Sequence, residues 1–152
     1  MTLRPAEPED LSAIQSLLQS LGLPHRDLTP SKLEHFLVYA EDETLCGVVG
    51  LELCGSDALL RSLAVPRERR YEGIAARLVE AIERHAEAVG VASIYLLTTT
   101  ATDYFRHFGY TPIGRDELPP AVQNTDEAAS LCPSSATCMR KGLQDEVERS
   151  QR

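Results

Sequence analysis

The sequence has no tryptophan and few aromatic residues, which make up 5% of the chain. It has no apolar run near the ~20 residues that a membrane-spanning helix needs. The first residues, 1–5, also lack the apolar stretch of a secretory signal peptide. These absences argue against a membrane protein, and we expect the protein to stay in the cytoplasm.

Basic residues are in the minority. Fifteen Lys and Arg stand against 23 Asp and Glu, and the formal net charge is -8. Because nucleic-acid phosphates are bound through clustered Lys and Arg, we expect no nucleic-acid partner. The exception is the group Arg67, Arg69 and Arg70. Such a local cluster suits one small polyanion, and the alternative is a solvated loop that binds nothing.

Cysteines are few, and their spacing is not that of a metal site. Cys46, Cys54, Cys132 and Cys138 match no common zinc signature, and the four histidines are scattered, so we predict no metal site. In the cytoplasm reduced thiols are expected. Cys46 and Cys54 lie an even number of residues apart in one predicted strand, so we expect small apolar fillers on the same side. Cys132 and Cys138 are either structural residues or ligands for a soft thiophile such as trivalent arsenic.

Length and composition are those of a globular protein. The chain of 152 residues is 43% hydrophobic and 25% charged, enough for a core of its own. We predict a single domain over residues 1–142, followed by a charged C-terminal tail over 143–152.

Hydrophobic periodicity predicts alternating strands and helices. The expected strands are 2–6, 36–40, 45–53, 58–65, 91–97, 110–113 and 137–141. The expected helices are 8–21, 29–33, 72–89 and 101–108. The strands at 45–53 and 58–65, joined by a turn at Gly55-Ser56, are apolar on both faces, which predicts a sheet that is covered on both sides. The expected fold class is therefore α/β (mixed α+β), with a central mixed sheet flanked by helices on both faces.

The segment from residue 63 to residue 75 carries the clearest functional pattern. A buried strand leads into a loop, and the loop opens the longest predicted helix. Helix N-termini present unpaired N–H groups and the positive end of the helix dipole, so they suit phosphate. Gly73 and Ala75 keep bulky side chains away, and the neighbouring arginines supply charge. This pattern predicts a site for a phosphate-bearing ligand.

The same segment resembles a known signature. Arg70-x-x-Gly73-x-Ala75, after Leu63-Ala64-Val65, resembles the coenzyme A-binding motif of the GNAT acyltransferases. The later run Ala101-x-x-Tyr104-Phe105-x-x-x-Gly109-Tyr110 is similar to that family's second landmark. The resemblance covers about residues 2–142, and it implies a GNAT-like acyltransferase fold and an acetyl-CoA-dependent N-acetyltransferase.

The resemblance also implies roles for particular residues. Backbone groups of Leu63, Ala64 and Val65 would bond the pantetheine arm of acetyl-CoA, which would enter a splayed gap between strands 58–65 and 91–97. Acetyl would pass directly from thioester to amine, without an acyl-enzyme. The pyrophosphate would be held by the loop of Arg70, Tyr71, Glu72, Gly73, Ile74 and Ala75.

Acetyl transfer needs a base, an oxyanion donor and an acid. The base removes a proton from the acceptor ammonium, and a backbone N–H near Val65 is the family's oxyanion donor. The family often uses a tyrosine of the second landmark as the acid, but here that position holds Phe105. Tyr104 is then the candidate acid, and the alternatives are a proton from water and a core aromatic role for Tyr104.

Glu52 and Arg61 interrupt strands that are otherwise apolar. With Gly55-Ser56 as the turn, Glu52 lies opposite Leu59, and Arg61 is its diagonal neighbour within reach of long side chains. Lone charges there would be costly. One interpretation is a structural ion pair. The other is that Arg61 binds the carboxylate of the acceptor while Glu52 draws a proton from its amine.

A narrower resemblance concerns the acceptor. Segments 59–65, 95–100 and 131–139 are similar to the arsenic-resistance N-acetyltransferases, and the Leu-Leu-Thr-Thr run at 96–99 resembles the amino-acid N-acetyltransferases of arginine synthesis. Both imply a small-molecule amine acceptor, an amino acid or an analogue of one, arsenic-containing analogues included. The alternatives are a non-catalytic module that binds acetyl-CoA or an arsenical, and a protein N-acetyltransferase. A homodimer is compatible with each of these functions.

Overall fold

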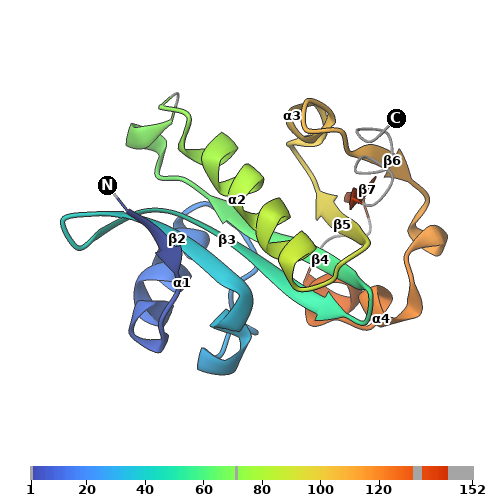
Figure 1. Cartoon of the computed structure of the whole chain (residues 1–152), viewed down its shortest axis with the longest axis horizontal. Helices are drawn as coiled ribbons and strands as arrows, with labels where there is room; N and C mark the ends of the chain where they lie inside the picture. Colours follow the sequence, from blue (N-terminus) through green and yellow to red (C-terminus); the bar gives the residue numbers. More distant parts are fainter. Residues whose placement is uncertain (1, 71, 132–134, 144–152) are drawn as a thin grey trace. The chain divides into compact units, whose positions relative to one another are not determined.

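The computed structural model describes residues 2–70, 72–131 and 135–143, without the side chains of 130 and 131 (Figure 1). The chain divides into two compact units. The N-terminal unit takes in Met1–Glu52 and Leu60–His85, and the C-terminal unit takes in Leu53–Leu59 and Ala86–Arg152.

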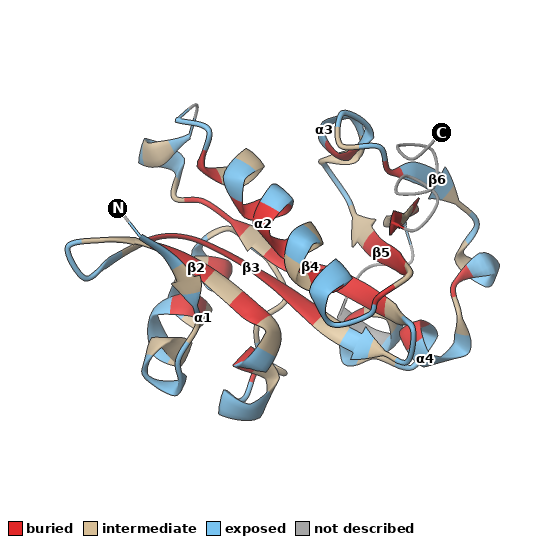
Figure 2. Ribbon diagram, in the orientation of Figure 1, coloured by how far each residue is buried: buried red, intermediate tan, exposed pale blue. Residues whose placement is uncertain are grey.

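The N-terminal unit is built on antiparallel strands. Strand β1 (Thr2–Pro5) pairs with β2 (Phe36–Glu41), and β2 pairs with β3 (Thr44–Cys54). Next along the sheet is β4 (Asp57–Ala64), and β3 and β4 both run on into the C-terminal unit. Figure 2 shows that β3 and β4 are buried along much of their length, as their two-sided apolar sequences predicted.

A bulge interrupts the pairing of β2 with β3. Tyr39 lies opposite Gly47, but Ala40 lies opposite Leu45, so Cys46 is the extra residue. The simple alternation that was expected to put Cys46 and Cys54 on one side is therefore broken at Cys46. Cys46 is buried and Cys54 is half-buried.

Helices cover both faces of these strands. Helix α1 (Leu11–Ser20) follows the 3-10 turn η1 (Pro8–Asp10) and shares a core with β2, β3 and the 3-10 helix η2 (Pro30–His35). Helix α2 (Ile74–Ala88) lies against the other face, because a side chain on Gly47 would meet its Ile74 and Leu78. The predicted arrangement of helices on both faces is thus found in this unit.

Three more strands belong to the C-terminal unit. They are β5 (Ser93–Thr98), β6 (Thr111–Ile113) and β7 (Thr137–Gly142). Strand β7 pairs antiparallel with both β5 and β6, whereas β5 runs parallel to the first residues of β4. The hydrogen-bonded order is β1-β2-β3-β4-β5-β7-β6. Because a parallel pair needs a crossover connection, the long helix between β4 and β5 is a consequence of this topology.

The shorter elements of this unit were only partly predicted. Helix α3 (Thr102–Arg106) lies within the expected helix 101–108. The stretch after β6 was expected to be irregular, but it contains η4 (Arg115–Glu117), α4 (Pro120–Gln123) and a π-helical turn, η5 (Glu127–Leu131). Proline at the first position starts α4, and elements this short carry too little periodicity to be recognised.

The predicted fold class is confirmed as a mixed sheet with helices. Among the described residues, no helix combines the length and the apolar character needed to cross a membrane. The single domain over 1–142 stays a prediction, and the tail beyond 143 lies outside the described residues.

A close approach between β2 and β3 generates a prediction for stability. Gly50 pairs with Phe36, which is fully buried, and a Cβ on Gly50 would overlap the Phe36 ring. We expect Gly50→Ala to lower the free energy of unfolding by about 1–3 kcal/mol, because the core is overpacked. Urea denaturation measures the loss. It should be smaller in a Phe36→Leu background, and an equal loss in both backgrounds would contradict the overlap.

Candidate cofactor and acceptor site

The predicted cofactor residues follow one another from the end of β4 to the start of α2. Ala64 and Val65 are buried and Leu63 is half-buried, so the strand reaches its end inside the protein. The 3-10 turn η3 (Arg67–Arg69) then leads to an exposed loop. Of the loop residues, Arg70, Glu72 and Gly73 are exposed, Ile74 is buried and Ala75 is half-buried, whereas Tyr71 lies outside the described residues.

Gly73 sets the point at which α2 begins. Its φ is +80°, a left-handed conformation that side-chain-bearing residues rarely adopt. Its carbonyl accepts the N–H of Arg77 at 3.2 Å, an early bond of the helix. The helix therefore starts at Ile74 rather than at residue 72 as predicted. A Cβ built on Gly73 meets no atom within 4 Å, so the backbone is accessible at the helix N-terminus, where phosphate is favoured.

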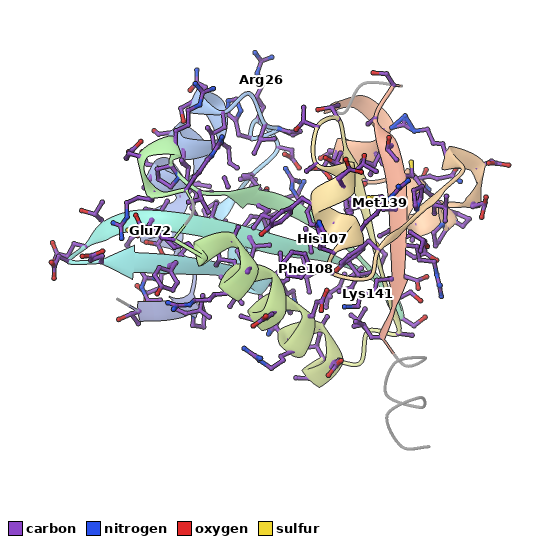
Figure 3. All side chains as sticks on the ribbon, turned by 90° about the horizontal axis from the view of Figure 1, so that it is seen from above. Arg26, Glu72, His107, Phe108, Met139 and Lys141 are labelled. Carbon is purple, nitrogen blue, oxygen red and sulfur yellow. The ribbon has the colours of Figure 1, made fainter. Side chains whose placement is uncertain are left out.

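The arginines of the loop do not all have the same role. Arg69 Nε lies 3.1 and 3.0 Å from the two carboxylate oxygens of Glu72, and Arg69 Nη2 lies 2.8 Å from Glu41 Oε2. Hydrogen bonds to Glu72 and Glu41 raise the pKa of Arg69 further. Arg69 therefore links the loop to the end of β2. This pairing corrects the expectation that Arg69 faces phosphate. Arg67 and Arg70 are the exposed cations, and Figure 3 shows Glu72 at the start of α2.

Ser62 is a site feature that the sequence did not reveal. It lies in β4 and is buried, yet its φ is 62°. A left-handed conformation is strained for any residue with a Cβ, and it occurs in strands where a bulge redirects the backbone. The ladder between β4 and β5 takes in Asp57, Ala58 and Leu59. The predicted splayed gap between these strands stays a prediction.

Four charged side chains meet on β3, β4 and the segments after α1. We call Asp27, Lys32, Glu52 and Arg61 the Arg61 charge cluster. Arg61 Nη1 lies 3.3 Å from Glu52 Oε1, so the predicted contact between these two residues is confirmed. Lys32 Nζ lies 2.9 Å from Asp27 Oδ2 and 3.5 Å from Glu52 Oε1. Asp27 and Lys32 were not predicted, because nothing local in the sequence links them to β4.

Arg61 is the centre of this cluster, and its side chain has no exposed surface. Asp27 binds it through both carboxylate oxygens, with Nη1 to Oδ2 and Nη2 to Oδ1 at 2.8 Å. Nη2 also donates to the Pro24 carbonyl at 3.4 Å, and Nε donates to Ser62 Oγ at 3.1 Å. With Glu52, these contacts use all five N–H groups of a guanidinium. The contacts favour the interpretation of Arg61 as a structural ion-pair partner.

Charge balance explains how the cluster tolerates the burial of the Arg61 and Asp27 side chains. Burial by itself raises the pKa of Asp27, but hydrogen bonds from Arg61 and Lys32 outweigh it and lower this pKa to about 2. Because the pKa is lower than in the unfolded chain, ionised Asp27 stabilises the fold above about pH 4. This contribution is lost as the pH falls towards 2.

Tyr104, the candidate acid, lies on α3 in the C-terminal unit. Its ring centroid is 5.8 Å from that of Phe105 and 5.2 Å from that of Phe108. Phe105 is buried, but Tyr104 is 37% exposed, so Tyr104 is not a core aromatic. Burial raises the pKa of Tyr104 above its usual value, which keeps the phenol protonated at neutral pH.

Cys138 is buried, and burial raises the pKa of its thiol. It belongs to an apolar cluster with Leu59, Tyr95 and Val122, which fits the structural interpretation. Cys132 lies outside the described residues, so the thiophile interpretation of the pair stays a prediction.

Sequence comparison finds relatives that match most of this chain. The amino-acid acetyltransferase of Azotobacter vinelandii is 31% identical over 127 residues, which are 78% of this chain and 29% of that protein. The relative from Pseudomonas putida strain KT2440, also named amino-acid acetyltransferase, is 30% identical over the same length. The chain therefore spans less than a third of the length of these relatives.

Solved structures have the same fold. N-acetylglutamate synthase from Neisseria gonorrhoeae, complexed with coenzyme A and N-acetyl-glutamate, aligns with a TM-score of 0.81 at 21% identity, over 93% of this chain and 35% of that one. A Mycobacterium tuberculosis protein in complex with CoA aligns with a TM-score of 0.78 at 17% identity, over 94% of this chain and 99% of that one.

The family model described as "Acetyltransferase (GNAT) domain" matches residues 32–112, from η2 to β6. This match takes in β4, the Gly73 loop, α2 and α3, and it covers more than half of the chain. The chain thus belongs to the GNAT acetyltransferase family.

Proposed function

We propose that this protein is an N-acetyltransferase that moves the acetyl group of acetyl-CoA directly to the amine of a small amino acid or amino-acid analogue. The observation that carries the proposal is the passage from β4 through the left-handed Gly73 to the N-terminus of α2, in a chain of the GNAT family. The relatives named amino-acid acetyltransferase and the synthase structure with coenzyme A support the amino-acid acceptor.

In this proposal the backbone of Leu63, Ala64 and Val65 receives the pantetheine arm. The first N–H groups of α2 have no partner within the helix and face the pyrophosphate. Arg70, which is exposed, adds a positive charge at the rim of the loop. Glu72 carries the wrong charge for a phosphate site, but its carboxylate is held by Arg69.

The reaction consists of one displacement at the thioester carbon. The acceptor amine loses a proton to Glu52, directly or through water, and its nitrogen then attacks the carbonyl. A backbone N–H near Val65 stabilises the oxyanion. When the C–S bond breaks, Tyr104 donates its proton to the departing thiolate.

The finer identity of the acceptor is part of the proposal. An α-amine on a carboxylate-bearing molecule is expected, and arsenic-containing amino acids fall within this class. A module that binds acetyl-CoA or an arsenical without turnover, and a protein N-acetyltransferase, are the alternatives. A cytoplasmic setting and a homodimer stay predictions.

One assay separates these functions. Release of free thiol from acetyl-CoA is measured against amino acids, arsenical and phosphinic analogues, polyamines and peptides. We expect turnover with amino acids or their analogues. Binding of acetyl-CoA without thiol release for any acceptor would favour the sensor, and turnover confined to peptides would favour protein acetylation.

The cofactor loop gives the first functional prediction. We expect Gly73→Glu to abolish acetyl-CoA binding, because the carboxylate would occupy the pyrophosphate position and repel it. Gly90→Glu is the matched control, since Gly90 has a φ of +88° beyond the other end of α2 and equally open surroundings. Isothermal titration calorimetry compares the two. Near-wild-type affinity in folded Gly73→Glu would remove the basis of the cofactor site.

The second prediction concerns the acid. Tyr104→Phe should lower kcat by roughly 10²-fold with little change in KM, because proton transfer to the thiolate acts mainly in the transition state. Tyr39→Phe serves as the control, since its hydroxyl, which lies 2.7 Å from Arg77 Nη1, belongs to the N-terminal unit. Steady-state kinetics with the best acceptor provide the test, and an unchanged kcat would mean that water supplies the proton.

The third prediction distinguishes the two interpretations of Arg61. Arg61→Lys keeps the charge but loses the planar fork that Asp27 binds. We expect the free energy of unfolding to fall by about 1–3 kcal/mol, with KM for a carboxylate-bearing acceptor near its wild-type value. Denaturation and steady-state kinetics on the same preparation distinguish the structural interpretation of Arg61 from the acceptor-binding one. Unchanged stability with a KM about tenfold higher would instead assign the acceptor carboxylate to Arg61.

A further inference from the structure

The α1–η2 loop, residues 21–29, contributes one carboxylate, that of Asp27, to the interior of the N-terminal unit. Asp27 has a side chain that is only 5% exposed, whereas its neighbour Arg26 is exposed and points away from the ribbon in Figure 3. The Pro24 carbonyl of the same loop also accepts from Arg61. Two groups of one loop therefore fix a guanidinium on β4, which follows Asp27 by 34 residues and Pro24 by 37.

The fixed guanidinium in turn constrains Ser62. A bidentate carboxylate sets the plane of an arginine fork, and with it the direction of the Nε–H bond. This N–H donates to Ser62 Oγ, 3.1 Å away. Ser62 is the β4 residue with a φ of 62°, a conformation that costs about 1–3 kcal/mol unless its surroundings impose it.

We propose that Asp27 is a positioning residue for acetyl transfer. Through Arg61 it holds Ser62 in the left-handed conformation, and so it fixes the backbone of Leu63 to Val65 against the pantetheine and the thioester. The proposal rests on the acetyl transfer proposed above. The α1–η2 loop thereby controls the backbone conformation of β4.

Two substitutions of Ser62 separate positioning from packing. Ser62→Ala removes the hydroxyl that Arg61 binds but keeps the strain of a Cβ at positive φ. Ser62→Gly also removes the hydroxyl, but glycine adopts this conformation without steric cost. We expect Ser62→Ala to lower kcat by about tenfold or more, and Ser62→Gly to lower it much less. Equal losses, or a larger loss in Ser62→Gly, would overturn the proposal.

Asp27→Asn tests the contact between Asp27 and Arg61, the first of the contacts that lead to Ser62. It should lower kcat as Ser62→Ala does, and the loss should shrink in a Ser62→Gly background, because the two residues then act through one conformation. Asp10→Asn is the matched control, since Asp10 also binds an arginine through both oxygens, at 2.8 and 3.0 Å from Arg4. A loss of melting temperature alone, or an undiminished kcat loss in the Ser62→Gly background, would make Asp27 merely structural. Should Asp27→Asn not fold, Asp27→Glu keeps the charge, displaces the carboxylate by one methylene and has the same two outcomes.

A ligand-free measurement keeps this test apart from the proposed function. Amide hydrogen exchange of the segment 60–66, followed by mass spectrometry, should be faster in Ser62→Ala and Asp27→Asn than in the wild type and in Asp10→Asn. Exchange in α2 should be unchanged. If the wild-type protein releases no thiol with any acceptor, the proposed acetyl transfer is refuted. The hydrogen-exchange comparison still tests whether Asp27 acts on Ser62 through Arg61. Unchanged exchange at 60–66 in both variants would overturn the positioning role itself.

Discussion

The N-terminal unit depends on the burial of one guanidinium. An unpaired charge with no access to water would cost several kcal/mol, so Arg61 can lie inside β4 only if carboxylates reach it. Glu52 comes from β3, next to β4 in the sheet, but Asp27 must come from the α1–η2 loop. Lys32 then balances the second carboxylate charge. The requirement for neutrality therefore brings a loop, a 3-10 helix and two strands to one place.

A second group of ion pairs lies at the proposed phosphate site of this acidic protein. The chain carries a net charge of -8, and Glu72 lies next to the N-terminus of α2. Arg69 pairs with both Glu72 and Glu41, so it offsets one of their two negative charges and ties the loop to the end of β2. The positive end of the helix dipole and the exposed Arg70 add positive potential at the loop. Local pairing, rather than overall charge, decides which ligand this loop suits.

The proposed chemistry draws on both of these arrangements. Glu52 is the carboxylate of the Arg61 charge cluster that is proposed as the base, and its side chain is 15% exposed against 5% for Asp27. This division suits a cluster in which Asp27 holds Arg61 in place and Glu52 remains within reach of an acceptor amine. The left-handed Ser62 connects the cluster to the strand residues that are expected to receive the cofactor.

Much of the fold was determined by the sequence alone. Local signals were sufficient for the main strands, for α1 and α2, and for the loop that leads into α2, because periodicity, glycine and helix termini act over a few residues. The contact between Glu52 and Arg61 was also predictable, since a two-residue turn fixes the register near it. By contrast, the bulge at Cys46, the place of β7 between β5 and β6, and the short α4 were decided by tertiary pairing. The same is true of Asp27 and of the left-handed Ser62, because the energy of a buried charge depends on groups that are distant in sequence and adjacent only after folding.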